Sequence, residues 1–264
     1  MASNCKGFKD IQAGFTNFGL SIFLAKADIR QRYRRSTLGP FWITISTGVM
    51  IACIGGIFGG LFKSPMHDFL PYLAAGLIIW AYISTCLTEA TTVFVSAEPV
   101  IKQLPLPIFT HVLRMVIRNF YIFLHNIVIF PIVLLFVNRS IGPALLAIIP
   151  GLILLTINLL WVSLILGIIC SRFRDLTQIV ASILQIMFYV TPIIWLPSLL
   201  PARTSMMMLD PNPFFHLMEI VRAPLMNFYP SMTNWVVSVM LAIFGWGVAI
   251  KMFNKYRSRI AYWL

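Results

Sequence analysis

The sequence predicts an all-α integral membrane protein, and three observations lead to that fold class: the composition, the length of the apolar runs and the placement of the basic residues. Of the 264 residues, 59% are hydrophobic and 11% are charged, whereas about 25% of an ordinary globular domain is charged. A soluble fold of this length could not remove so much apolar surface from water. A disordered chain would be far more polar.

Six apolar runs have the roughly 20 residues that a helix needs to cross a bilayer. Helices are expected because a lone helix satisfies its own backbone hydrogen bonds in lipid. The six predicted transmembrane helices cover residues 40–62, 69–88, 119–137, 141–170, 176–200 and 233–250. The fourth is longer than the bilayer requires and should tilt or protrude. Pro192 and Pro197 should bend or end the fifth.

The basic residues predict the orientation. Sixteen of the 20 Lys and Arg lie in the two tails and in the loops after the second and fourth spans. By the positive-inside rule, these segments and both termini are cytoplasmic. The net charge of +12 is therefore a topology signal rather than a nucleic-acid surface. We expect a single domain, 1–264, with a cytoplasmic interfacial helix at 1–39, a six-span bundle at 40–250 and a cytoplasmic tail at 251–264.

An amphipathic helix is predicted before the first span. Apolar residues recur there every three or four positions, at Phe8, Ile11, Phe15, Phe18, Ile22, Ala25 and Ile29. Basic residues crowd the end of this stripe, so we expect a helix lying on the inner leaflet, with a break near Gly14 or Gly19.

Two loops are longer than plain connections. Residues 96–111 contain three prolines and are too polar to span, but they are long enough for one or two short cytoplasmic helices. Residues 196–232 are external, apolar and rich in proline. Because an apolar loop is unfavourable in water, we expect short re-entrant helices that dip into the outer leaflet.

No catalytic or metal-binding residues are predicted. The four histidines are isolated, and no Cys/His pair has the spacing of metal ligands. The Gly-rich stretch 55–64 lacks the Gly before Lys63 that a phosphate-binding loop needs, so the chain itself should hold no ATP or other cofactor. Glu89 is the one candidate carboxylate for ion coupling, but a Glu at a helix end is more often solvated or paired with Arg. Energy should come from a partner.

Three segments resemble the ABC-2 type export permeases, the membrane subunits that export bacterial O-antigen, capsule and teichoic acid. Residues 28–42, Asp-Ile-Arg-Gln-Arg-Tyr-Arg-Arg-Ser-Thr-Leu-Gly-Pro-Phe-Trp, resemble the entry to that family's first span. Arg174-Asp175, with Gln185 and Thr191-Pro192-Ile193, is similar to its fifth-span signature. Asn212-Pro213-Phe214, with Arg222 beyond it, resembles its segment before span six. The pattern covers nearly the whole chain in order.

The resemblance implies a homodimeric permease in the bacterial inner membrane, docked on two copies of a separate ATPase that binds ATP and Mg. It implies a coupling helix between spans two and three, with Glu98, Pro99, Lys102, Pro105 and Pro107 as candidate contacts. The cargo would be a lipid-linked polysaccharide whose undecaprenyl diphosphate end enters near the interfacial helix. Two interpretations apply equally to Arg172, Arg174 and Asp175: a second, smaller ATPase contact, or a helix cap with a local ion pair.

Other candidate residues have two interpretations each. The cluster Arg30, Arg32, Arg34 and Arg35 either binds the diphosphate head group or holds anionic lipid as a topology signal, with Tyr33 and Trp42 as interfacial anchors in both cases. The overlapping pairs Gly55–Gly59 and Gly56–Gly60 permit close helix packing, against either a second protomer or another span. The aromatic residues that either line a sugar channel or pack the bundle are Tyr82, Phe188, Tyr189 and Trp195.

The leading hypothesis is therefore an O-antigen exporter, with capsule or teichoic acid as an alternative cargo. An ABC-2 exporter of a drug or small lipid is a second hypothesis, although the short external segments favour a lipid-linked polymer. A membrane enzyme acting on a lipid-linked substrate is a third, and it would depend on Asp210, His216 and Glu219 as an external polar group.

Overall fold

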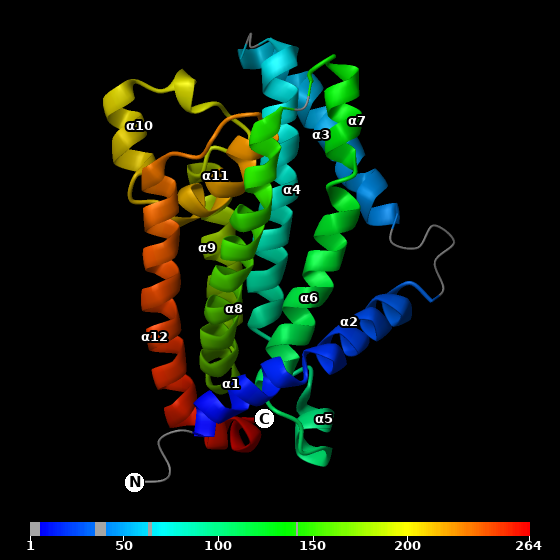
Figure 1. The fold of residues 1–264 in the computed structure, drawn as a ribbon, viewed down its shortest axis with the longest axis vertical. Coiled ribbons are helices and arrows are strands. Elements are labelled where there is room, and N and C mark those ends of the chain that lie inside the picture. The colour runs from blue at the N-terminus through cyan, green and yellow to red at the C-terminus, as the bar shows by residue number, and fades with distance from the viewer. Residues whose placement is uncertain (1–5, 35–40, 63–64, 141) are drawn as a thin grey trace.

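The computed structural model describes residues 6–34, 41–62, 65–140 and 142–264. These residues form helices joined by turns, with no strand in the described ranges, so the predicted all-α class is confirmed. The long helices lie side by side as a bundle (Figure 1). They are α3 (Phe41–Phe62), α4 (Met66–Ala90), α6 (Phe109–Asn126) continued by α7 (Ile129–Phe136), α8 (Ile148–Arg172) and α12 (Met232–Trp263).

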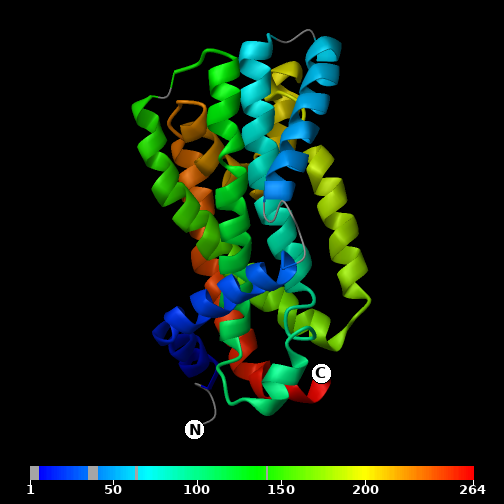
Figure 2. The ribbon, with the colours of Figure 1, turned by 90° about the vertical axis from the view of Figure 1, so that its right-hand side faces the viewer.

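The shorter helices lie at the two ends and on the side of the bundle. One end carries α1 (Lys6–Thr16), α2 (Phe18–Arg32), α5 (Glu98–Gln103) and the last turns of α12 (Figures 1 and 2). We call it the basal end. The remaining elements are the 3₁₀ helices η1 (Pro143–Ala147) and η2 (Pro197–Leu199), and the helices α9 (Leu176–Val190), α10 (Ala202–Leu209) and α11 (Pro213–Leu225).

Five described helices are long and apolar enough to cross a membrane, not six. They cover Phe41–Leu61, Met66–Ala90, Phe109–Phe136, Pro143–Arg172 and Met232–Trp263. The expected fifth span, 176–200, stops as a helix at Val190, because Thr191 is extended and Pro192 cannot donate a backbone hydrogen bond. At about 1.5 Å per residue, the 15 residues of α9 fall short of a hydrocarbon core about 30 Å thick. The six-span prediction is therefore confirmed for five helices only.

Two helices extend beyond their predicted spans at the basal end. The third span was expected from residue 119, but α6 begins at Phe109. Residues 251–264 were expected as a tail, yet α12 continues to Trp263. Both extensions bury apolar side chains, including Val112 on α6 and Phe253 and Ile260 on α12. Packing below the membrane-spanning part therefore keeps both segments helical.

The predicted N-terminal helix is present as two pieces that lie obliquely across the basal end (Figure 1). The break falls between Thr16 and Phe18, within two residues of Gly19, as predicted. Close contact fixes α1 on α12, because a Cβ at Gly7 would lie 2.6 Å from the backbone nitrogen of Asn254. The Phe8 N–H also donates to Asn254 Oδ1 at 2.9 Å. Helix α1 is therefore fixed against α12, close to the C-terminal end of the sequence.

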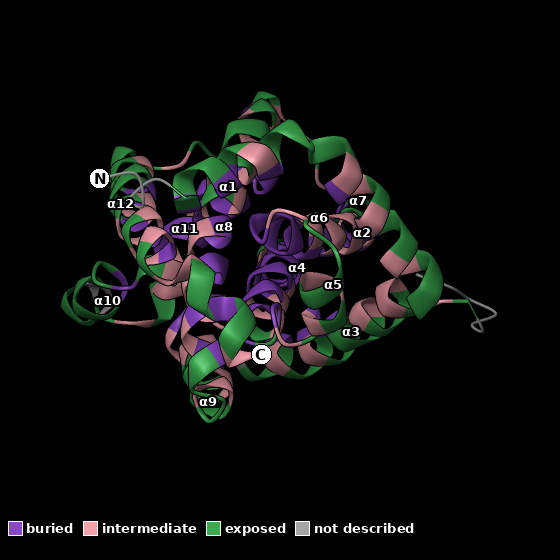
Figure 3. Cartoon of the chain, turned by 90° about the horizontal axis from the view of Figure 1, so that it is seen from below, coloured by how far each residue is buried: buried purple, intermediate pink, exposed green. Residues whose placement is uncertain are grey.

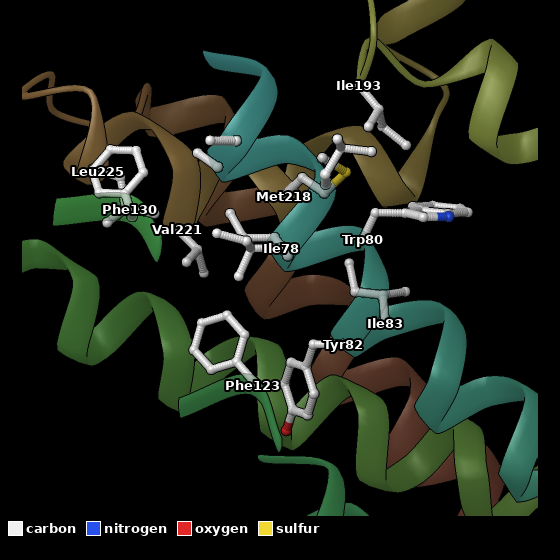
Figure 4. Packing of buried hydrophobic residues seen from close by; sticks show 14 of the residues in the cluster. Ile78, Trp80, Tyr82, Ile83, Phe123, Phe130, Ile193, Met218, Val221 and Leu225 are labelled. Atoms are coloured by element: carbon white, nitrogen blue, oxygen red, sulfur yellow. The ribbon is translucent and has the colours of Figure 1, made fainter. Parts of the chain in front are cut away.

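Helix α4 forms the centre of the bundle, with buried residues along its whole length (Figure 3). Ile78 and Tyr82 on α4 meet Phe123 on α6 and Met218 and Val221 on α11 in one hydrophobic cluster (Figure 4). In the most apolar 18-residue stretch of α4, 78% of the residues are buried, whereas in that of α3 only 11% are. Helix α3 therefore packs on the edge and leaves most of its surface outside this chain's own core.

The apolar stretch 196–232 contains η2, α10 and α11. Helix α11 enters the bundle and buries Met218, Ile220 and Val221 completely. Asn212 caps it by accepting a hydrogen bond from the Phe214 N–H at 3.0 Å, and Pro213 occupies the first turn. That these helices dip into the outer leaflet stays a prediction.

The two overlapping glycine pairs of α3 face different surroundings. An ideal Cβ at Gly55 would lie 2.5 Å from Leu70 Cδ1, and one at Gly59 would lie 2.5 Å from Met66 Sδ, so this pair packs on α4 of the same chain. At Gly56 and at Gly60, nothing described lies within 4 Å. The second pair therefore belongs to the outer surface of α3.

Leucine substitutions should separate the two pairs. Gly55→Leu should destabilise the protein by about 1–3 kcal/mol, because the added side chain overpacks the contact with Leu70 on α4. Gly56→Leu adds the same side chain one residue away in open space and should leave the melting temperature of the purified chain unchanged. Equal losses in the two variants would contradict the assignment of the faces.

Candidate functional site

Asp10 joins three elements at the basal end. Its side chain is 1% exposed and accepts hydrogen bonds from the backbone N–H groups of Ile108, at 3.2 Å, and Phe109, at 2.9 Å. These groups begin α6, where free N–H groups and the helix dipole favour a carboxylate. Arg257 on α12 donates Nε to the same carboxylate at 2.6 Å. Asp10 therefore ties α1, α6 and α12 to one another.

The predicted coupling segment forms one short helix and an extended turn. Glu98 and Lys102 of α5 form an exposed i,i+4 ion pair at 2.7 Å, and Pro99 lies in the first turn of the helix. The segment then leads through Leu104, which is 52% exposed, to α6. It borders a groove of about 510 Å³, which we call the basal groove, whose lining includes Lys6, Lys9, Leu104, Pro105, Pro107 and Arg257.

The second predicted contact, after α8, is exposed at the same end. Arg172 lies 5.3 Å from the ring centroid of Phe173 and 5.5 Å from that of Trp263, near the end of α12. Arg174 and Asp175 are also exposed. Asp175 occupies the N-cap position of α9, but its side chain makes no capping hydrogen bond. The capping interpretation of this residue is therefore wrong.

An ion network connects α2, α4 and α6 beside the coupling segment. Asp28 binds Arg114 Nε at 2.6 Å and Arg118 Nη1 at 3.0 Å. Glu89 in turn accepts from Arg118 Nη2 at 2.5 Å and from Arg32 Nη2 at 2.9 Å. Glu89 is therefore paired with arginines, and this network uses it as a structural group rather than as a free ion-coupling carboxylate.

The Asp28 carboxyl stays ionised within this network. Burial alone would raise its pKa, but the hydrogen bond and charge of Arg114 and the charge of Arg118 outweigh burial and hold the pKa below its usual value. The carboxylate can therefore bridge both guanidinium groups at neutral pH, which fixes α2 against α6.

The predicted head-group arginines lie together at the end of α2, as far as they are described. Arg30, Arg32 and Arg34 are exposed, and Tyr33 between them is half-buried. Trp42, near the start of α3, is 58% exposed, as an interfacial anchor would be. Arg35 and Pro40 lie outside the described residues. Head-group binding at this surface stays a prediction.

Three of the four candidate channel aromatics lie together, and one lies apart. Phe188 and Tyr189 are in ring contact at 5.3 Å, and Trp195 Nε1 donates to the Tyr189 carbonyl at 3.1 Å. Tyr82 is instead 3% exposed in the core, where its hydroxyl meets Thr156 Oγ1 at 3.2 Å. Tyr82 therefore packs the bundle, and Tyr189, at 59% exposed, is the ring most available to a ligand.

A buried charge cluster holds the chain where α9 ends. Arg222 of α11 is fully buried, pairs with Glu219 and donates to the Pro192 carbonyl. Its guanidinium lies 4.1 Å from the ring centroid of Tyr72, and the Tyr72 hydroxyl donates to the same carbonyl at 3.0 Å. The i,i+3 spacing of Glu219 and Arg222 could have indicated their ion pair, but no local pattern indicates Tyr72, which reaches the cluster from α4.

Two members of the external polar trio, His216 and Glu219, are engaged in contacts with other residues. His216 Nε2 bonds the backbone carbonyl of Asp210 at 2.8 Å, and its Nδ1 bonds Asn234 Oδ1 at 2.8 Å. Glu219 is paired with Arg222, and the Asp210 side chain is exposed. The His216 and Glu219 side chains therefore hold a turn and two helices in place. Across the described part of the chain, no three His, Cys, Asp or Glu residues gather as a metal site.

Comparison with known proteins agrees with this architecture. Residues 20–226 match the ABC-2 type transporter family. The chain is 25% identical over 251 residues to an O-antigen export system permease protein RfbA of Klebsiella pneumoniae, covering 92% of this chain and 94% of that protein. It is 26% identical over 211 residues to the protein of the same name from Myxococcus xanthus, covering 78% and 79%. Because the family match spans most of the sequence, the chain belongs to the ABC-2 type transporter family as a multi-pass membrane permease.

Proposed function

We propose that this chain is the permease subunit of an ATP-driven exporter that moves lipid-linked polysaccharide across the bacterial inner membrane. O-antigen linked to undecaprenyl diphosphate is the cargo we favour. Membership of the ABC-2 family supports the transport class. The relatives named as O-antigen export permeases, which align over most of this chain, support the cargo.

The observation that carries the proposal is the mechanical linkage at the basal end. The coupling segment leads directly into α6, whose first N–H groups are held by Asp10, and Asp10 also holds α12. A force on residues 98–107 would therefore reach α6 directly and α12 through Asp10 of α1. Two ATPase subunits with ATP and Mg would supply that force to two copies of this chain.

The arrangement of the chain ends fits the proposed orientation. Helices α1, α2 and α5 and the end of α12 share the basal end (Figure 2). We take this end as cytoplasmic because it holds most of the basic residues. The exposed arginines at the end of α2 would then face the anionic inner leaflet and the head group of the cargo.

Capsule, teichoic acid, or a small lipid or drug are alternative cargoes for the same machinery. The membrane-enzyme alternative receives no support from the external trio, because His216 and Glu219 are each engaged in structural contacts.

An aspartate in the coupling segment should disconnect the transporter from its ATPase. Leu104→Asp places a charge where an exposed apolar side chain borders the basal groove, and an apolar contact with the partner would lose its anchor. We expect export of polysaccharide to the cell surface to fall at least about tenfold. We also expect less ATPase to be recovered in pull-downs of the tagged permease.

Leu199→Asp is the matched control, because Leu199 is similarly exposed, at 45%, but lies in η2 at the opposite end. It should retain both export and ATPase recovery. Normal ATPase recovery with Leu104→Asp, at equal membrane levels of the two variants, would contradict docking at the basal groove.

A further inference from the structure

A cavity of about 360 Å³ lies at the end of the bundle opposite the basal end. It is lined by Tyr72 of α4, helix α11, the loop 226–231 and the first turn of α12, and we call it the external cavity. Figure 1 shows α11 and the start of α12 far from α1 and α5, at the end that the proposed orientation makes external. The volume is within the usual range of small-molecule sites, about 300–1,000 Å³.

Two of the aromatic rings that line the external cavity are exposed. Phe228 is 61% exposed and Tyr229 is 72% exposed, and both lie in the loop between α11 and α12. Large apolar side chains left exposed beside a cavity are typical of a ligand site. An aromatic ring carries negative potential on its face, so it attracts the slightly positive C–H groups on one side of a pyranose ring. These two rings therefore offer stacking surfaces for a sugar.

Two polar side chains that line the cavity keep unused hydrogen-bonding groups. Arg222 donates Nε, at 3.0 Å, and Nη2 to the same oxygen of Glu219, Oε1, so Oε2 has no donor among the described residues. Asn234 uses Oδ1 for His216, at 2.8 Å, and its Nδ2 has no acceptor in the described part of the chain. Neither Oε2 nor Nδ2 is among the buried polar atoms without a partner, so both keep accessible surface. The cavity therefore offers one acceptor and one donor to a ligand.

The charges of the external cavity cancel. Glu219 is the one carboxylate that lines it and Arg222 the one basic side chain, and the two form an ion pair. The Arg222 side chain is 1% exposed, so it holds the carboxylate from behind and is not itself a donor to a ligand. A balanced pair favours neither an anion nor a cation, and a neutral ligand with hydroxyl groups suits the cavity best.

We propose that the external cavity binds one sugar unit of a glycan. Sugar hydroxyls would donate to Glu219 and accept from Asn234, while the C–H face of the ring stacks on Tyr229 or Phe228. The inference rests on the proposed function for the source of the glycan, but it concerns a different place from the predicted channel aromatics, none of which lines this cavity. A site there would hold units that have already crossed the membrane, which disfavours their return.

Saturation-transfer NMR on the purified full chain tests this site without ATP or the ATPase. The probe is the glycan released by mild acid from the surface polysaccharide of the bacterium that produces the chain. The protein is held in a detergent that has no sugar head group, and its aromatic protons are irradiated. Saturation passes to the C–H protons of a sugar that stacks on the rings, so we expect a signal from the sugar ring protons.

Two variants of one exposed residue separate stacking from other effects. Tyr229→Ala removes a ring and should weaken binding about fivefold, whereas Tyr229→Phe keeps the ring and should retain most of the binding. The matched control is Phe136→Ala, because Phe136 is 77% exposed at the same end of the bundle, on α7, and lies outside the cavity lining (Figure 1). All three variants should melt at the temperature of the parent chain, since each residue is exposed.

Each outcome decides the proposal. Saturation of the sugar that Tyr229→Ala weakens, and that Tyr229→Phe and Phe136→Ala retain, establishes the site. The absence of transfer to the sugar in the parent chain overturns it, and so does equal transfer in the parent and in Tyr229→Ala, which would assign the two exposed rings to the bilayer interface. A failure of the exporter assignment would appear instead in the ATPase pull-down, which this experiment does not use.

Discussion

Asp10→Ala should lower the free energy of unfolding by about 3 kcal/mol or more, because one side chain serves three helices. The variant leaves two N–H groups at the start of α6 without their acceptor, and it leaves Arg257 without its partner. Loss of a helix cap costs about 1 kcal/mol, and breaking a buried ion pair costs about 3–5 kcal/mol. The lower end applies here because the Arg257 side chain is 33% exposed.

The measurement is thermal unfolding of the detergent-solubilised chain, followed by tryptophan fluorescence. Asp175→Ala is the matched control: Asp175 also stands at a helix start, but it is exposed and makes no capping hydrogen bond, so its removal should change little. If both variants melt at the same temperature as the parent, Asp10 does not hold the basal end together. Force on α5 would then have no fixed route from α6 to α12.

Arg222→Met should destabilise the other end of the bundle by about 3–4 kcal/mol. It removes the donor to the Pro192 carbonyl and the cation that stacks on Tyr72, and it leaves Glu219 largely buried without a counter-charge. Because the Pro192 carbonyl marks the end of α9, we also expect α9 to lose its fixed position. Protease cleavage within residues 191–201 should become faster.

Adding Glu219→Gln to Arg222→Met should recover part of the stability, since it removes the uncompensated charge. Arg203→Met, on exposed α10, is the control and should behave as the parent chain. A melting temperature for Arg222→Met that matches the control, with unchanged cleavage, would show that the cluster does not anchor α9.

The sequence predicts much of this fold because the bilayer imposes simple rules. Apolar length identified the five long spans, and the proline at 192 indicated where α9 ends. The stripe from Phe8 to Ile29 indicated helix before the first span. These signals are local, so they can be recognised without tertiary contacts.

What the sequence did not reveal depends on contacts between distant segments. Nothing near Asp10 indicates that its carboxylate meets Phe109 and Arg257, which are 99 and 247 residues away. Likewise, GxxxG spacing cannot tell the Gly55 face from the Gly56 face, because both pairs have the same local pattern. The burial of Tyr82 and that of His111 also follow only from how the helices pack.

The central claim is that this chain works as the membrane half of an ATP-driven exporter. The most direct test is to solubilise the tagged chain from its own membranes in mild detergent and to determine the mass of the intact complex. We predict two copies of this chain with two copies of a soluble ATPase that carries a phosphate-binding loop. A chain recovered without any ATPase, under conditions in which related complexes stay intact, would contradict it.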